Sequence, residues 1–163
     1  MDPTEALFLN HLIWVEQQFY SASPHADQTP EDRTTVRIWL LWAFEHGFLH
    51  TFTLRGDSLF PAIALLYRPV QSANLDRYRD HYYKTIFEFD RSGDTLLIDF
   101  CYAPGHIPFV LGLLKRSGYP NVAWEHNKTG RIHFVPAKRL KVMSASTSSN
   151  SKPSKTASSR KRE

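Results

Sequence analysis

The sequence predicts a single α+β domain in which a mixed β-sheet is flanked by helices. Segments whose apolar residues recur at helical spacing are interspersed with short runs rich in branched and aromatic residues, which are typical of strands. The segments follow one another as two helices, a hairpin, a central strand, a helix and a last hairpin, an order typical of α+β chains. With 163 residues, 42% of them hydrophobic, the chain can bury a core of its own.

The first 47 residues predict two amphipathic helices. Residues 4–20 carry one apolar stripe, and Thr29 followed by Pro30 predicts the start of a second helix, which ends at Gly47. Both stripes are expected to face the core. They consist of Phe8, Leu12, Val15 and Phe19 in the first helix and of Val36, Trp39, Leu40, Ala43 and Phe44 in the second.

Residues 48–89 predict three strands and a polar helix. Residues 48–54 and 59–67 form a hairpin in this interpretation, because the Gly and Asp of residues 55–58 favour a tight turn between them. Residues 72–85 predict a polar helix with three tyrosines, and residues 86–89 predict a short strand.

The second half of the chain predicts a central strand, a helix and a closing hairpin. Residues 95–102 are apolar without polar alternation, which indicates a strand covered on both faces. A turn at residues 103–105 leads into a helix over residues 106–117. Residues 122–125 and 131–135 predict the hairpin.

Asp99 is the anomaly in the central strand. An ionised carboxylate away from water must be hydrogen-bonded or paired with a positive charge, and such groups gather at functional sites. Two interpretations remain open from the residues alone: Asp99 belongs to an active site, or it accepts structural hydrogen bonds. Strand alternation also places Cys101 on the face of Asp99, as a nucleophile or as a buried structural thiol, and the second role is the commoner one for a free cysteine.

The turn after the central strand is a candidate anion site. Ala103, Pro104, Gly105 and His106 lie where a strand leads into a helix N-terminus, a place where backbone N–H groups are expected to receive a phosphate or an oxyanion.

These residues carry a resemblance to a known family. Gly93-Asp94, Leu97-Ile98-Asp99-Phe100 and Ala103-Pro104-Gly105 resemble the signature of the toxin-activating lysine acyltransferases of the hemolysin-activating type, distant relatives of the GNAT acetyltransferases. Upstream, Ser23-Pro24-His25 resembles the family's short His segment, and Pro61-Ala62-Ile63-Ala64 resembles its Pro-Val-Ala strand. Leu96-Leu97 stands where the family usually has an aromatic residue.

The resemblance implies a GNAT-like sheet and a lysine acyltransferase. The acyl donor would be an acyl carrier protein or an acyl-CoA thioester, with no tightly bound cofactor, and the acceptor would be a lysine amine of a protein. His25 and Asp99 would be the catalytic pair, with His25 as the base and Asp99 orienting it. The turn at residues 103–106 would hold the thioester oxygen or the phosphopantetheine. The related enzymes are often dimers, so the resemblance also implies a homodimer.

Two other functions remain open from the residues. The chain could be a non-catalytic interaction protein that keeps a GNAT-like scaffold and holds a partner through Trp14, Trp39, Tyr78 and Tyr82. Nucleic-acid binding is disfavoured, because residues 1–142 hold 15 Lys and Arg against 15 Asp and Glu. The formal net charge of +4 therefore comes from residues 143–163, a Ser-, Lys- and Arg-rich tail that we expect to be disordered.

Cysteine usage and motifs set further bounds. One cysteine excludes an internal disulfide, and the absence of an apolar N-terminal signal or long apolar run predicts a cytoplasmic protein without a membrane span. No metal site is expected, because Gly47 interrupts the helical spacing of His46 and His50 and no acidic or cysteine cluster completes a site. The pyrophosphate loop of CoA-dependent GNAT enzymes is also missing, which favours a carrier-protein donor or no donor at all.

Overall fold

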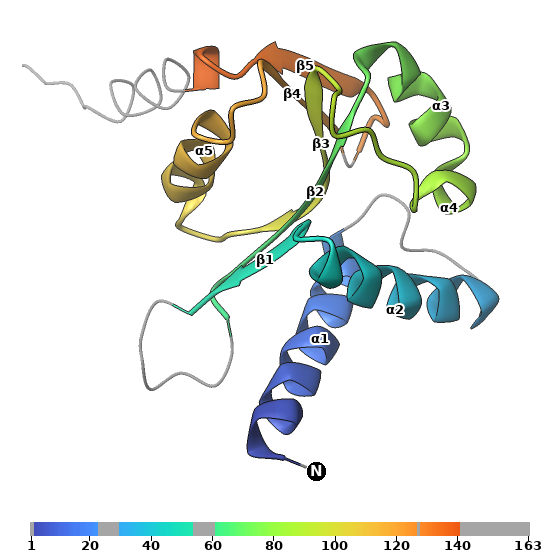
Figure 1. Ribbon diagram of the computed structural model, residues 1–163, viewed down its shortest axis with the longest axis vertical. Coiled ribbons are helices and arrows are strands. Elements are labelled where there is room, and N and C mark those ends of the chain that lie inside the picture. The colour runs from blue at the N-terminus through green and yellow to red at the C-terminus, as the bar shows by residue number, and fades with distance from the viewer. Residues whose placement is uncertain (1, 23–29, 54–60, 127, 141–163) are drawn as a thin grey trace, which may run out of the picture.

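The computed structural model describes residues 2–22, 30–53, 61–126 and 128–140. Their strands form one mixed sheet of five (Figure 1). The strands lie in chain order, and only the β3–β4 pair is parallel. A parallel pair needs a crossover connection, and a helix between β3 and β4 supplies it. The strands are β1 (Leu49–Phe52), β2 (Ile63–Val70), β3 (Thr95–Tyr102), β4 (Asn121–Glu125) and β5 (Ile132–Pro136).

Helices cover both faces of the sheet. The crossover helix α5 (Ile107–Lys115) packs on one face through Val110 and Leu114. The helices α1 (Pro3–Ala22) and α2 (Pro30–Glu45) pack on the opposite face against Leu66 and Phe100. A 3₁₀ turn (Ser72–Asn74), α3 (Leu75–Asp80) and α4 (Tyr82–Thr85) lie on this second face beside α1 and α2 (Figure 1). The prediction of an α+β domain with a mixed sheet between helices is therefore confirmed.

A β-bulge interrupts β3 at Asp99. Leu66 pairs with Phe100 and Tyr67 pairs with Ile98, so Asp99 has no residue opposite it in β2. A bulge inserts one extra residue and shifts the alternation of all later side chains. Cys101 therefore packs in the cluster around α5, whereas Asp99 faces the α3–α4 side, where it contacts Arg68. The prediction that strand alternation puts Asp99 and Cys101 on one face is wrong for this reason.

Several predicted elements are confirmed with small shifts. The predicted helices over 4–20 and 106–117 correspond to α1 and α5, and β3 has the predicted bounds. The helix α2 ends two residues before Gly47, which has a φ of 78°. The hairpins β1–β2 and β4–β5 are both antiparallel as expected.

The predicted short strand at residues 86–89 is wrong. The backbone carbonyl of Glu88 accepts a hydrogen bond from the side chain of Arg68, and Asp90 N–H donates to the carbonyl of Pro69. Side-chain and turn hydrogen bonds thus replace the ladder that a strand would need. The predicted helix at 72–85 is likewise divided, because His81 adopts φ −125° and ψ 51° between α3 and α4.

The strand β2 continues to Val70, three residues beyond the predicted end, and includes a proline. The N–H and C=O of a strand residue point to the same edge, and the carbonyl of Pro69 accepts from Asp90 on the side away from β3. The missing N–H of Pro69 therefore removes no β2–β3 hydrogen bond.

Most of the predicted core residues are buried. In α2, Val36, Trp39, Leu40 and Ala43 are buried, whereas Phe44 is 48% exposed beside Phe8 of α1. Three aromatic residues of the predicted partner surface also lie inside the molecule: Trp39, Tyr78 and Tyr82. The interaction surface proposed from those side chains is therefore wrong.

Two further expectations fall on residues that the structure does not describe. The tail at residues 143–163 and the hairpin turn at residues 55–58 lie outside the described residues. None of the described helices combines the length and the apolar character that a membrane span requires.

Candidate functional site

The parallel strands β3 and β4 separate at their carboxyl ends. Their pairing extends from Thr95 opposite Asn121 to Ile98 opposite Trp124 and stops there. Beyond that point, β3 continues along β2 alone and β4 along β5 alone. A cavity of about 380 Å³ opens at the place where the two strands part, within the size range of small-molecule sites.

The cavity has two parts, one on each face of the sheet. One part lies against α5 and is apolar. The other part lies toward α3 and α4 and contains the charged side chains. The residues of the α5 part include Ile98, Cys101, Val110, Leu111, Leu114 and Leu140. Those of the α3–α4 part include Arg68, Tyr78, Arg79, Tyr82, Asp99 and Glu125. Since residues of both faces line one cavity, it passes around the end of the β3–β4 ladder.

A buried ion pair between Arg68 and Asp99 lines the charged part of the cavity. The two side chains are 1% and 2% exposed. Arg68 Nη2 donates to Asp99 Oδ1 over 3.4 Å, and Nε lies 3.2 Å from Oδ2 at ion-pair distance without hydrogen-bond alignment. The bulge in β3 places the carboxylate next to this guanidinium, because Arg68 lies on the adjacent part of β2. Asp99 is therefore a compensated buried charge.

The guanidinium of Arg68 also holds the segment after β2. Its Nη1 donates to the backbone carbonyls of Thr85 and, at 2.9 Å, of Glu88, and its Cζ atom lies 4.7 Å from the ring centre of Tyr78. Burial, and secondarily the charge of Asp99, raise the pKa of the Tyr82 hydroxyl well above its usual range. The Tyr82 side chain therefore stays a neutral phenol in the wall of the cavity.

The predicted site residues fall in different places. Asp99 lines the cavity. His25 lies outside the described residues, so the structure does not show whether it meets Asp99. The turn residues Ala103, Pro104, Gly105 and His106 do not line the cavity, although the next residue, Ile107, does. The structure therefore does not bring the predicted anion-binding turn and Asp99 into one lining surface.

The turn also uses many of its own backbone donors. His106 N–H donates to the carbonyl of Ala103, and the N–H groups of Phe109 and Val110 both donate to the carbonyl of His106. Pro108 has no N–H to offer. Gly105 has a φ of 77°, so its left-handed conformation shapes the turn. An anion at this helix end would meet fewer donors than the sequence suggested.

The thiol of Cys101 does not suit nucleophilic chemistry. Burial raises its pKa to about 11, so the thiol is protonated at neutral pH. The side chain packs among the apolar residues that face α5. The alternative of a structural thiol therefore fits its surroundings.

Three charged cavity residues escaped the sequence reasoning: Arg68, Arg79 and Glu125. Arg68 is the only charged residue between Pro61 and Val70, as Asp99 is in its own strand. Two apolar strands with one opposite charge each could have predicted that these two residues pair. Glu125 gave no such signal, because it ends a short strand where polar residues are common. Its position became apparent only when β4 was aligned with β3.

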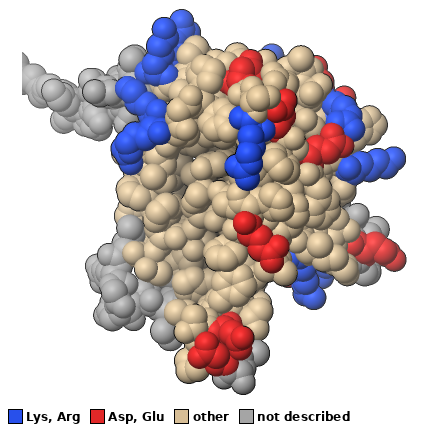
Figure 2. Space-filling view, viewed as in Figure 1, with Lys and Arg blue, Asp and Glu red and all other residues tan. Residues whose placement is uncertain are grey.

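The described residues hold no metal cluster, and the face drawn in Figure 2 carries charges of both signs. Among the described residues, no group of three or more His, Cys, Asp or Glu side chains could hold a metal ion. Figure 2 shows Lys and Arg interspersed with Asp and Glu over the face it displays. The chain matches no model of a known protein family, and no curated protein matches it either.

Proposed function

We propose that the chain is an acyltransferase on a GNAT-like sheet, which moves an acyl group from a thioester of an acyl carrier protein or CoA to a lysine amine. The observation that carries this proposal is the cavity at the parting of β3 and β4, apolar toward α5 and charged toward α3 and α4. An acyl thioester is likewise an apolar chain that ends in a polar, reactive group.

The apolar part of the cavity suits an acyl chain. Its walls are the aliphatic side chains of β3, α5 and Leu140, and each methylene group that leaves water gains about 0.8 kcal/mol. The six methylene groups of an octanoyl chain would thus gain about 5 kcal/mol before the costs of ordering the chain. Beyond Ile98 the backbone of β3 no longer pairs with β4, so its groups on that edge could bind an extended thioester arm as a strand would.

Covalent geometry limits the distance between His25 and the cavity. Ala22 lines the cavity, and an extended chain advances at most about 11 Å over the three residues that follow. In the proposal His25 takes the proton of the amine, and the carboxylate of Asp99 orients the imidazole ring. Because Arg68 already compensates Asp99, this carboxylate acts mainly through orientation and supplies little net charge.

The reaction balances without a further reactant. The neutral amine nitrogen attacks the thioester carbon and passes one proton to the base as the C–N bond forms, and the tetrahedral intermediate then expels the sulfur as a thiolate. A C–N bond forms and the C–S bond breaks. The thiolate takes the proton from the imidazolium, so the products are an amide and a free thiol.

Intact mass spectrometry tests the proposal. The purified protein is incubated with a series of acyl-CoAs and acyl carrier proteins, and donor consumption and acylation of the protein are measured together. His25→Ala and Asp99→Asn are expected to lose transfer, whereas His11→Ala, whose side chain lies on α1 and does not line the cavity, is expected to keep it. Circular dichroism establishes that each variant is folded.

A further variant tests where the acyl chain binds. Leu111→Trp fills the apolar part of the cavity and is expected to shift the preference toward shorter chains. Folded wild-type protein that consumes no donor of any length would refute the acyltransferase. In that case the Arg68–Asp99 pair would be a structural element, as in the interpretation of the chain as an interaction protein.

A further inference from the structure

We propose that the outer surface of α5, together with the residues that follow β5, binds the surface of an anionic lipid bilayer. The partner is a layer of negatively charged headgroups above hydrocarbon, which the protein contacts from one side without crossing it. This inference goes beyond the acyl transfer proposed above and does not depend on it. It rests on where the charges lie, on which of them are paired, and on the apolar side chains beside them.

The charges of the chain divide unequally between its two parts. Residues 1–100 hold 8 Lys and Arg against 14 Asp and Glu. Residues 101–140, the basic part, hold 6 Lys and Arg against Glu125 alone. The equal numbers of opposite charges over residues 1–142 therefore conceal a molecule with one acidic and one basic part. A basic part of this kind attracts polyanions such as nucleic acids and anionic membranes.

The cations of the basic part have no carboxylate partners in the part of the chain that the structure describes. The ion pairs found there join Asp and Glu side chains to Arg37, Arg68, Arg77 and Arg79. The six Lys and Arg of residues 101–140 take part in none of these pairs, and all six are exposed. Their charge is therefore available to an external anion.

Four of these cations surround the C-terminal end of α5 and form what we call the α5 basic cluster. They are Lys115, Arg116, Lys138 and Arg139. The first two end the helix, and the second two lie between Ala137 and Leu140, which pack with Leu114 of α5 in one buried cluster. Over most of the face in Figure 2 both signs of charge are present, but toward the upper left, over α5, Lys and Arg gather without Asp or Glu between them.

The outer surface of α5 adds apolar side chains to these cations. Ile107 and Phe109 are 50% and 40% exposed. Phe109, Gly112 and Arg116 follow one another at helical spacing on the side opposite to the buried residues of α5. A Cβ at Gly112 would lie 3.1 Å from Nη1 of Arg116, so the guanidinium lies along this side of the helix. Because α5 contains no Asp or Glu, its surface offers only apolar contacts and positive charge.

This combination fits a membrane surface better than a nucleic acid. Phosphate backbones are bound through charge and hydrogen-bond donors, to which exposed aliphatic groups add nothing. A bilayer has anionic headgroups for the cations and an apolar boundary that Ile107 and Phe109 can enter. Residues 141–163 follow Leu140 directly and hold six Lys and Arg against one Glu, so they tether further positive charge to the same side.

Co-sedimentation of the full chain with sucrose-loaded vesicles tests this assignment. Vesicles of phosphatidylcholine alone are compared with vesicles that contain about 30% phosphatidylglycerol, at about 0.1 M salt, where the Debye length is about 10 Å. Binding is expected only to the anionic vesicles. Polyglutamate and an oligothymidylate, added at equal total charge, serve as soluble competitors and are expected to displace less protein than unloaded anionic vesicles do.

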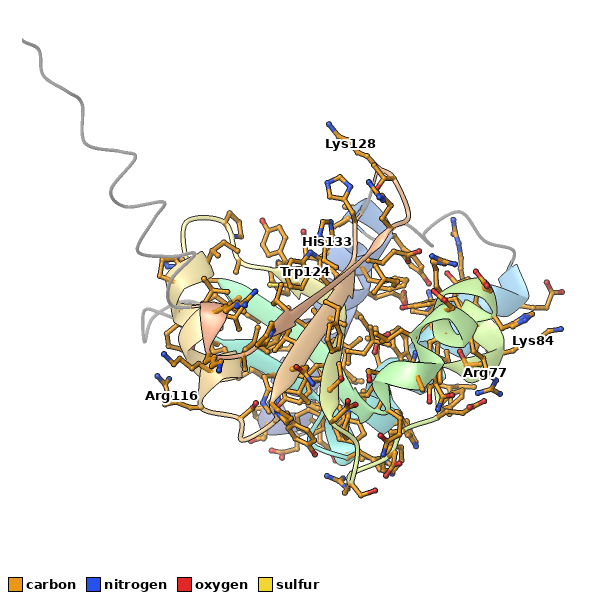
Figure 3. All side chains as sticks on the ribbon, turned by 90° about the horizontal axis from the view of Figure 1, so that it is seen from above. Arg77, Lys84, Arg116, Trp124, Lys128 and His133 are labelled. Atoms are coloured by element: carbon orange, nitrogen blue, oxygen red, sulfur yellow. The ribbon has the colours of Figure 1, made fainter. Side chains whose placement is uncertain are left out.

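Charge variants locate the binding surface. Lys115→Gln is expected to weaken binding to the anionic vesicles about 5-fold, and Lys115→Gln combined with Lys138→Gln about 25-fold, since each cation near such a surface contributes about a factor of five. Lys84→Gln is the matched control, because it removes an exposed cation from α4, on the other side of the molecule from Arg116 (Figure 3). Its affinity is expected to stay within about twofold of the wild type.

Apolar variants distinguish a membrane from a soluble polyanion. Phe109→Ser is expected to weaken vesicle binding roughly 3- to 8-fold, because the exposed part of the ring leaves the apolar boundary. Phe109 also packs on Phe52, with ring centres 5.1 Å apart, so Ile107→Ser is a second variant that keeps this pair. Ile38→Ser, at a 57% exposed position of α2, is expected to bind as the wild type does. Circular dichroism establishes that each variant is folded.

Three results would overturn the assignment. The first is a wild-type chain that does not sediment with the anionic vesicles. The second is an equal effect of Lys115→Gln and Lys84→Gln, or no effect of the double variant, which would attribute binding to overall charge or to residues 141–163. The third is unchanged vesicle binding of folded Phe109→Ser and Ile107→Ser, or stronger displacement by a soluble competitor than by anionic vesicles, which would assign the α5 basic cluster to a nucleic acid or an acidic protein.

Discussion

Replacing Asp99 with asparagine is expected to lower the free energy of unfolding by about 3 to 5 kcal/mol. The substitution keeps the shape of the side chain but removes its charge, so the guanidinium of Arg68 stays buried without compensation. Both side chains are at most 2% exposed, and the shortest distance between them is 3.2 Å. Water therefore cannot take over the role of the lost carboxylate.

The pair can be dissected with a double-mutant cycle. Arg68→Met removes the guanidinium and its hydrogen bonds to the carbonyls of Thr85 and Glu88, so it is expected to cost as much as Asp99→Asn or more. The variant with both substitutions has neither buried charge. We therefore expect it to be more stable than the sum of the two single losses predicts, by roughly 1 to 3 kcal/mol.

Urea unfolding followed by tryptophan fluorescence measures these changes. The chain has four tryptophans, and one of them, Trp39, is buried with its ring centre 6.0 Å from that of Tyr82 in the cavity wall, so part of the emission reports on this region. At a typical slope of about 2 kcal/mol per molar urea, the loss for Asp99→Asn moves the midpoint down by roughly 2 M.

A midpoint for Asp99→Asn within about 0.3 M of the wild type, equivalent to roughly 0.5 kcal/mol, would refute the reasoning, because it would mean that the carboxylate does not offset a buried charge. Strictly additive single effects would refute the direct pairing of the two side chains. Asp99→Glu serves as the control that keeps the charge but lengthens the side chain.

Other positions give independent tests. Cys101, whose pKa burial raises to about 11, is expected to react with iodoacetamide far more slowly at pH 8 than it does in urea, and equal rates would contradict its burial. Gly93→Ala is expected to destabilise the fold by about 1 to 3 kcal/mol, because a Cβ would lie 2.2 Å from the backbone oxygen of Val70. Gly112→Ala, which meets only the flexible end of a side chain, is the matched control in the same urea assay, and equal effects of the two substitutions would argue against the clash. Burial lowers the pKa of His50 below its usual value near 6.5, so its neutral form stabilises the fold above pH 6.5, and this stability is lost as the pH falls through the lowered pKa. The urea midpoint is therefore expected to fall between pH 7.5 and pH 5 in the wild type and to change less in His50→Phe, and identical pH dependences would remove His50 as the cause.

Local patterns in the sequence were enough to place most of the elements. The apolar stripe of the first helix, the proline that opens the second and the unbroken apolar run of β3 each depend on neighbours a few residues apart. Asp99 stood out for the same reason, because a carboxylate inside such a run is unusual in any fold. These features could be read without knowing which segments touch.

Which residues these features contact depends on how segments that are distant in the sequence pack together. The bulge at Asp99 arises from the pairing of β3 with β2, and it turned Cys101 to the opposite face from the one that simple alternation predicts. The exposed aromatic surface expected at Trp39, Tyr78 and Tyr82 became core because α2, α3 and α4 pack together on one face of the sheet. The sequence pattern of these helices did not reveal that the three aromatic side chains are buried, because burial depends on which other elements cover a side chain.

The sequence by itself determined the α+β class, the central strand, the crossover helix and the unusual carboxylate at Asp99, since each follows from residue type and short-range spacing. Only the tertiary structure decided that Arg68 compensates Asp99, that β3 and β4 part after Ile98, and that Glu125 joins them at the cavity. The physical reason is that burying a charge requires a partner, and the register of adjacent strands, set by packing on both faces of the sheet, selects which residue becomes that partner.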